Sequence, residues 1–192
     1  ALQAQLAQTP REDLLSIRGT EAERQEVTLP PPPPRRPRMQ TAADDGGVYL
    51  SDLTWESARA GWTPNGDALP RRDQDIENHP LTLGSRVYRK GLGTHAPSEI
   101  VYRLEGEYAR FRADIGGAEG NGTIIFQVFG DDKPLYESGV VHGLREVKRL
   151  DLPLAGIRRL RLIVTDAGDG HTADMANWAE ARVLKTVPEA TP

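Results

Sequence analysis

The chain contains no cysteine among its 192 residues, which excludes disulfide bonds, thiolate metal sites and a cysteine nucleophile. It also has no apolar run that approaches the roughly 18 residues of a membrane-spanning helix. Positive charge is not in excess, since the net charge is −4, and this argues against a general nucleic-acid binder. The apolar fraction of 38% is low for a globular protein. The deficit lies mostly in the first 47 residues, so the length fits one domain plus an appendage.

Residues 1–47 are predicted to form an N-terminal arm. Thr9, Pro10 and Glu12 have the spacing of a capping box, which predicts a short helix over about residues 10–18. A helix this short is marginal in water unless its apolar side packs on something. The residues of that side, which we expect to dock on a partner, are Leu14, Leu15 and Ile17.

A proline run at residues 30–38 continues the arm, and it favours the extended polyproline II form. One interpretation is a stiff spacer between the arm and the next domain. The other is a strap that docks on an acidic partner surface. The residues expected to make those contacts are Pro31, Pro34, Arg35, Arg36 and Arg38.

Residues 48–187 have the pattern of an all-β domain, and residues 188–192 are a short tail. Apolar residues alternate with polar ones in several short segments, which are separated by turns rich in glycine. No helix of three turns is convincing in this part of the chain. The predicted strands are 98–104, 108–115, 123–129, 134–138, 145–150, 157–165 and 181–185.

Gly91, Gly93 and Ala96 match G-x-G-x-x-A, a loose form of the dinucleotide-binding fingerprint. That fingerprint requires a helix after the glycines, because the helix N-terminus binds the pyrophosphate. Here Pro97 and the strand-like segment 99–104 follow. We therefore interpret the segment as a shaped loop before a strand rather than as a nucleotide site.

Several segments, taken in order, resemble one known family. They are Tyr49-Leu-Ser-Asp-Leu53 with Trp55, Lys90-Gly-Leu-Gly-Thr-His-Ala-Pro-Ser98, Phe111–Gly116, Phe126–Asp131 with Leu135–Gly139, and Leu160–Gly170 with Asp174–Arg182. Together they resemble the NPCBM modules, a family of novel putative carbohydrate-binding modules attached to glycoside hydrolases. The resemblance covers about residues 48–185.

The resemblance implies a jelly-roll-like antiparallel β-sandwich of the galactose-binding-domain type, binding of galactose-type sugars and, in some members, a structural calcium. The chain departs from the family pattern near its C-terminus. The usual Asp-His-Ala-Asp-Trp is replaced by Asp174-Met175-Ala176-Asn177-Trp178, and the usual Gly-Asp-Gly turn reads Gly130-Asp131-Asp132. Replacing the histidine by Met175 exchanges a hydrogen-bonding ring for an apolar chain, which would weaken sugar binding if that histidine contacts the sugar.

A sugar site needs an aromatic face for the C–H side of the ring and fixed polar groups for the hydroxyls. Trp55, Trp62 and Trp178 are the candidate aromatic platforms, and core packing is the alternative role for each. His95 could instead bond only to backbone, and Asp174 could instead cap a turn. The candidate hydroxyl partners are Lys90, His95, Asp131, Asp174 and Asn177.

No cofactor is required by this interpretation, although a structural calcium is an option, with Asp52 and Glu180 as candidate ligands. The segment 166–177 fails as an EF-hand, because Gly168 stands where a side-chain oxygen is required and Asn177 stands where the final glutamate is required. The four histidines lack zinc spacing, and no G-x-S-x-G nucleophile motif is present. We expect the chain not to be an enzyme.

Two functions are compatible with these observations. The first is a non-catalytic, extracytoplasmic module that binds a galactose-type glycan. The second is a scaffold subunit of a larger assembly, with membrane association as an option, in which the sandwich docks proteins and the arm binds it to them. The altered 174–178 motif and the arm motivate the second, but the first is preferred because the motifs that support it cover more residues. The family resemblance and the start at Ala1 rather than Met suggest a periplasmic or secreted protein.

Overall fold

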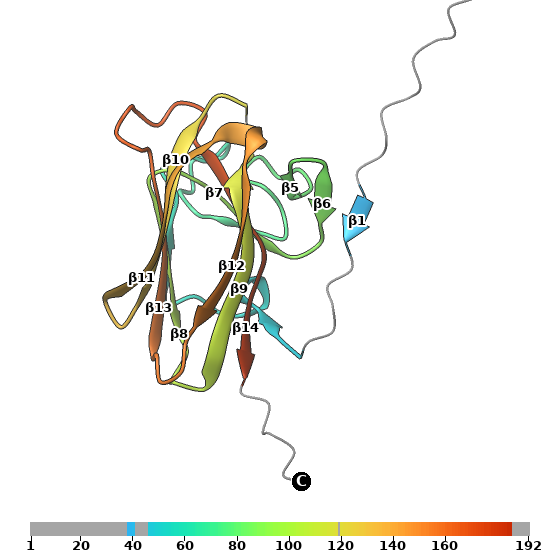
Figure 1. Ribbon diagram of the computed structural model, residues 1–192. Coiled ribbons are helices and arrows are strands. Elements are labelled where there is room, and N and C mark those ends of the chain that lie inside the picture. Colours follow the sequence, from blue (N-terminus) through green and yellow to red (C-terminus); the bar gives the residue numbers. More distant parts are fainter. Residues whose placement is uncertain (1–37, 41–45, 119, 186–192) are drawn as a thin grey trace, which may run out of the picture. The chain divides into compact units, whose positions relative to one another are not determined.

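Two antiparallel sheets pack face to face in the computed structural model, which describes residues 38–40, 46–118 and 120–185 (Figure 1). The first sheet has the order β11 (Lys133–His142), β10 (Thr123–Gly130), β13 (Arg159–Thr165), β8 (Ser98–Arg103) and β3 (Ser57–Arg59). The second has the order β12 (Val147–Pro153), β9 (Tyr108–Gly117), β14 (Met175–Lys185), β7 (Gly91–His95) and β4 (Arg71–Arg72), and β2 (Val48–Tyr49) also pairs with β14.

A small third sheet has the order β1 (Arg38–Gln40), β6 (Arg86–Tyr88) and β5 (Thr82–Leu83). In this sheet β1 runs parallel to β6, whereas β5 and β6 form an antiparallel pair. Two single-turn 3₁₀ helices, η2 (Leu50–Asp52) and η3 (Gly143–Arg145), connect strands. None of the helices in the described part of the chain is long and apolar enough to cross a membrane.

The alternation of side chains along the strands decides which face each sheet turns to the core. In β10 every second residue is buried, including Phe126 and Val128, and β13 buries Leu160, Leu162 and Val164 in the same way. The opposite faces of both strands carry half-buried and mostly polar residues. This period of two produces a core that lies between the two sheets.

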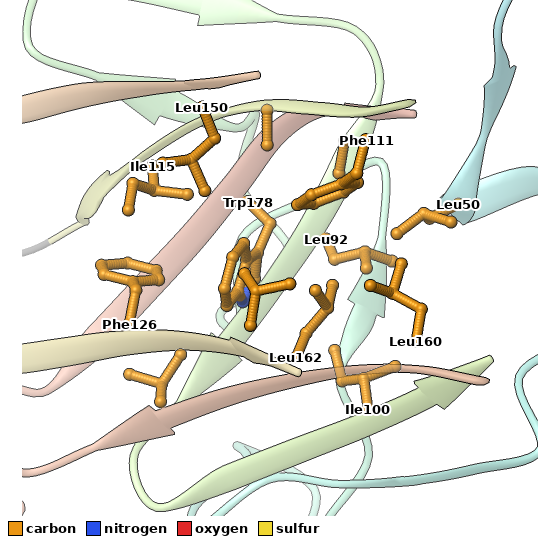
Figure 2. Close-up of a cluster of buried hydrophobic side chains, with 14 of the residues drawn as sticks. Leu50, Leu92, Ile100, Phe111, Ile115, Phe126, Leu150, Leu160, Leu162 and Trp178 are labelled. Carbon is orange, nitrogen blue, oxygen red and sulfur yellow. The ribbon is translucent and has the colours of Figure 1, made fainter. Parts of the chain in front are cut away.

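Trp178 lies at the centre of this core (Figure 2). Its ring meets the ring of Phe126 edge-on at 4.9 Å and contacts Phe111 at 6.5 Å between centroids. Edge-to-face packing of this kind is favourable because the positive ring edge meets the negative face. Trp178 is fully buried, so its ring packs against apolar side chains rather than solvent.

A glycine in β7 allows a segment earlier in the chain to pass directly against this strand. A Cβ at Gly93 would collide with the backbone of Gln74 and Asp75, so only glycine lets that segment cross β7. The crossing places residues 74–79 beside the C-terminal end of β7. That end is where the candidate site lies.

The predicted all-β, jelly-roll-like sandwich is confirmed, and the seven predicted strands correspond to β8–β14 with shifted ends. The prediction that 91–95 is a loop is wrong: these residues form β7, with every residue buried between β14 and β4. No helix follows the glycines, which is consistent with rejecting a nucleotide site. The predicted helix over 10–18 and docking residues Leu14, Leu15, Ile17, Pro31, Pro34, Arg35 and Arg36 lie outside the described residues, and of Arg38 only the backbone is described.

Candidate functional site

A cavity of about 380 Å³ lies where β7 ends and β14 begins. Its volume falls at the lower end of the range of small-molecule sites, about 300–1,000 Å³. Four segments that are distant in sequence contribute its walls, and most of the wall surface is apolar. The residues that line it are Trp62, Glu77, His95, His171, Thr172, Ala173 and Met175.

Trp62 is the aromatic wall of this cavity, and its side chain is 42% exposed. The preceding residue, Gly61, fixes the loop: its N–H donates to the carbonyl oxygen of His95 at 3.0 Å. A Cβ at Gly61 would collide with the carbonyl oxygen of Ala96, so this close approach requires glycine. The Trp62 ring therefore projects from a backbone held directly against the end of β7.

His95 forms the base of the cavity between two other rings. It is 5% exposed, and its centroid lies 5.7 Å from that of Trp62 and 6.4 Å from that of His171. Its Nδ1 lies 2.7 Å from the carbonyl oxygen of Ala96. Because a carbonyl can only accept, Nδ1 carries the proton of the neutral ring and Nε2 is its acceptor atom. Such a fixed acceptor suits a sugar hydroxyl.

The loop between β13 and β14 closes one side of the cavity, and aspartates hold its shape. Asp174 is fully buried and accepts from the N–H of Thr123 at 3.1 Å, while its own carbonyl accepts from the N–H of Ala96 at 3.0 Å. Burial raises the pKa of Asp174, and the nearby Asp169 carboxylate raises it further. The Thr123 hydroxyl donates to Asp169 at 2.5 Å. Asp174 therefore positions the loop and its carboxylate does not line the cavity.

Glu77 supplies the carboxylate of the cavity. It lies in a turn that Asp75 holds together, because one Asp75 oxygen accepts from the N–H groups of Glu77 at 2.9 Å and His79 at 2.8 Å. Neither lysine nor arginine is among the lining residues. The cavity thus offers acceptors and two imidazoles to a ligand but no permanent cation.

Of the residues predicted to contact a ligand, His95 and the candidate platform Trp62 line this cavity. Trp178 is corrected from a platform to a core residue, because β14 turns it between the sheets. Asn177 is also fully buried, and its Nδ2 donates to the carbonyl oxygen of Thr82 at 3.2 Å. Its amide therefore holds the segment before β6 rather than facing a ligand.

Asp131 and Trp55 lie away from the cavity and are occupied by other contacts. Asp131 comes directly after β10, and Thr123 stands at the other end of that strand, about 23 Å away. The Asp131 carboxylate accepts from the N–H groups of Arg158 and Arg159 at 3.0 and 2.9 Å. Trp55 packs on the core, and the guanidinium of Arg72 lies 3.9 Å over its ring. The structure therefore does not bring either residue to the cavity that His95 lines.

Lys90 precedes β7, at the end opposite to His95, and binds two carboxylates. Its Nζ lies 2.5 Å from Asp52 and 2.8 Å from Asp73. Partial burial alone would lower the pKa of Lys90, but these hydrogen bonds outweigh it and raise the pKa. Lys90 is therefore a permanent cation that links segments 52 and 73 and not a ligand-binding residue of the cavity.

Both candidate calcium ligands, Asp52 and Glu180, are bound by side-chain cations in this arrangement. Asp52 is bound by the Lys90 ammonium, and Glu180 accepts from the Tyr49 hydroxyl at 3.1 Å and from Arg182 at 3.4 Å. A divalent cation would have to compete with Lys90 and Arg182 for these carboxylates. Across 38–40, 46–118 and 120–185, no group of three or more His, Cys, Asp or Glu side chains could hold a metal ion.

Several cavity residues were not predicted as ligand contacts from the sequence, namely Glu77, His171, Thr172 and Ala173. They lie in two irregular segments without a motif of their own, and only tertiary structure places them at one point. Trp62 was a candidate platform, yet nothing local distinguished it from Trp55 and Trp178. Met175 was noted as a departure from the family pattern, and that departure does mark a wall of the cavity.

A cavity formed by loops at the end of a β-sandwich, with an exposed aromatic ring, is the arrangement of a small-ligand-binding module. The comparison with family models agrees with this class. The model described as NPCBM/NEW2 domain matches residues 46–184. The chain therefore belongs to the NPCBM/NEW2 family.

Two curated relatives are large proteins, and the chain matches only a part of each. The chain is 32% identical over 148 residues to a putative endo-alpha-N-acetylgalactosaminidase of Renibacterium salmoninarum, which covers 74% of this chain and 10% of that protein. It is 35% identical over 121 residues to alpha-1,3-galactosidase B of Akkermansia muciniphila, covering 57% of this chain and 15% of that protein. The chain thus spans a small fraction of the curated relatives.

Solved structures of the CBM51 type share the fold. The CBM51 of Clostridium perfringens GH95, in complex with methyl-galactose, is 33% identical and covers 71% of this chain and 99% of that chain, with a TM-score of 0.65. CBM51-2 of C. perfringens ZmpB, in complex with GlcNAc, is 30% identical, covers 71% of this chain and 31% of that chain, and has the same TM-score. These similarities favour the carbohydrate-binding hypothesis over the scaffold hypothesis.

Proposed function

We propose that this chain is a non-catalytic module that binds a neutral, galactose-type terminal sugar in the Trp62 cavity. The observation that carries the proposal is the exposed Trp62 ring beside the acceptor nitrogen of His95. A sugar ring can lie with its C–H face on the indole while its hydroxyls bond to His95 and Glu77. The methyl-galactose and GlcNAc complexes of two CBM51 relatives support a sugar as ligand.

The composition of the cavity supports binding without catalysis. Most glycosidases need two carboxyl groups on opposite sides of the scissile bond. Glu77 is the one carboxylate among the lining residues, and Asp174 is turned into the protein by its bond to Thr123. In another ZmpB structure the CBM51 domains accompany a separately named M60 catalytic domain. A sugar-binding module of this kind acts outside the cytoplasm, in the periplasm or secreted, attached to or assembled with a glycan-processing enzyme.

The affinity for one monosaccharide should be weak. A methyl galactoside has about 13 non-hydrogen atoms, and about −0.3 kcal/mol for each atom gives a Kd of about 1 mM. Calorimetry or NMR titration of the whole chain with methyl β-D-galactoside measures this value. Methyl β-D-glucoside, which differs at one hydroxyl, tests whether the cavity reads the axial hydroxyl.

The variant Trp62→Ala should reduce galactoside affinity at least tenfold, because it removes the stacking face. Val140→Ala is a matched control, since Val140 is a similarly exposed apolar residue on β11 and does not line the cavity. Unchanged affinity in Trp62→Ala, with the control also unchanged, would place the sugar elsewhere and refute the proposal.

A further inference from the structure

A second cavity, of about 480 Å³, lies on the outer face of the β12–β9–β14 sheet. The turn between β5 and β6, at Gly84 and Ser85, forms one wall, and the outward side chains of β9 and β12 form another. Its lining shares no residue with the Trp62 cavity. The residues that matter for its chemistry are Arg86, Tyr88, Asp114, Val147 and Arg149.

A nearly buried carboxylate organises this cavity. Asp114 is 7% exposed, and each of its oxygens has a partner: Oδ2 accepts from the Tyr88 hydroxyl at 3.0 Å, and Oδ1 accepts from Nε of Arg149 at 3.1 Å. Burial, and then the Asp114 charge, raise the pKa of Tyr88, so its hydroxyl stays a donor. Asp114 is thereby satisfied by the protein and holds Arg149 in place.

The Arg149 guanidinium bonds to Asp114 through Nε, and its side chain is 71% exposed. A guanidinium has a second donor edge, formed by its two terminal nitrogens, which matches the oxygens of a carboxylate or sulfate. Arg86, also exposed, adds a second guanidinium to the same cavity, and one of its donors bonds to the Tyr88 side chain. Two arginines against one aspartate leave this cavity positive, in a chain whose net charge is −4. The local charge is therefore opposite to that of the whole chain.

The remaining wall is apolar and open. Val147 is 44% exposed, and space for a ligand is left beside the turn, because a Cβ at Gly84 would meet only the Val147 methyl group, at 3.8 Å. The cavity thus combines an oxyanion-binding edge with a small apolar contact. The Trp62 cavity shows the reverse: it has Glu77 and no lysine or arginine in its lining.

We propose that this second cavity binds an acidic sugar through its oxyanion, a sulfate ester or a carboxylate, with Arg149 and Arg86 holding the oxygens and Val147 contacting the ring. The saccharide part of this statement rests on the function proposed above, whereas the oxyanion part rests on the two arginines. The chain then has two sites of opposite preference, one for a neutral and one for an anionic sugar residue.

The test is an NMR titration of the whole ¹⁵N-labelled chain with galactose 6-sulfate, methyl galacturonide and methyl β-D-galactoside at low salt. The two acidic sugars should shift amides in segments 84–88 and 147–149, and raising the salt to about 0.5 M should weaken both effects. The neutral galactoside should shift only amides around Trp62. A comparison of the two acids shows whether sulfate or carboxylate is preferred.

Arg149→Gln should weaken acidic-sugar binding about tenfold, because one guanidinium is lost. Arg59→Gln is the matched control: Arg59 is 72% exposed, pairs with Glu99 and lies on β3 of the other sheet. Arg86→Gln keeps the test decisive if Arg149→Gln proves unstable through Asp114. Unchanged binding in a folded variant, equal shifts from the neutral sugar, or equal affinity for inorganic sulfate would each overturn the proposal. Acidic binding without neutral binding would instead refute the function proposed for the Trp62 cavity.

Discussion

Trp62 and Trp178 show how one residue type takes two roles according to its surroundings. Trp178 fills the space between the sheets and contacts Phe126, whereas Trp62 projects into solvent from a loop. Because Trp178 is buried, it contributes chiefly to the free energy of unfolding. Trp62 is exposed and lines a cavity, and for this reason we propose that it contributes chiefly to ligand affinity.

Trp178→Ala should lower the free energy of unfolding by about 3–5 kcal/mol, because a large cavity remains in the core. Urea denaturation measures this loss. Trp62→Ala should change the same quantity by less than about 0.5 kcal/mol, as expected of an exposed side chain. Trp178→Phe, which should stay folded, should bind methyl galactoside as the native chain does. A specific loss of sugar affinity in Trp178→Phe would show that Trp178 acts on the ligand after all.

The Lys90 ammonium lies between Asp52 and Asp73 and forms an ion pair with each. Its replacement by methionine should cost about 1 kcal/mol of stability, since the pair is partly solvated and water screens it. Lys185→Met is the control for this loss of stability, because Lys185 pairs with Glu107 at a more exposed position.

Adding EDTA or calcium should leave the unfolding midpoint of the native chain unchanged. A calcium-dependent rise of the native midpoint would instead show that a metal binds.

At the scale of elements, the site depends on loops that are held against strand ends by backbone contacts. Gly61 lies against Ala96, and Gly93 lies against segment 74–75. Neither glycine has a backbone conformation that requires glycine by itself, because neither has a positive φ angle. The requirement comes entirely from the neighbouring chain.

Gly61→Ala should therefore displace the loop that carries Trp62 and reduce galactoside affinity at least tenfold. Gly120→Ala is a matched control, since nothing lies within 4 Å of a Cβ at that position and its φ is not positive. Calorimetry measures the affinity, and the fluorescence of Trp62 reports its environment. If Gly61→Ala binds as tightly as Gly120→Ala does, the close approach to Ala96 does not control the site.

At the scale of the whole molecule, the sandwich should fold and bind its ligand without the N-terminal arm. Both proposed cavities and the core are built from residues after position 46, and β1 contributes three residues that pair with β6. A chain of residues 46–185 should unfold cooperatively and bind methyl galactoside with the affinity of the full chain. Loss of cooperative unfolding or aggregation would show that β1 is needed to cover the edge of β6.

The sequence by itself determined the class of fold. The alternation in β9, β10 and β13 predicts strands with one buried face, because side chains alternate between the faces of a strand. It did not predict β7, since a segment with Gly91 and Gly93 lacks the apolar alternation that marks a strand. Gly93 is needed because segment 74–75 crosses against it, and Gly91 is needed because β14 lies against it and its φ is +145°. The contacts with segment 74–75 and β14 involve residues far apart in sequence, which no local pattern contains.

The candidate site could be predicted only in part. The segment around His95 was identified from its density of special residues, and His95 lies at the base of the cavity. Only the tertiary structure decided that Trp62 lines the cavity, that Trp178 faces the core, and that Glu77 and His171 join His95. The physical reason is that sheet register and loop packing, which are set by contacts between residues far apart in sequence, decide where each side chain points.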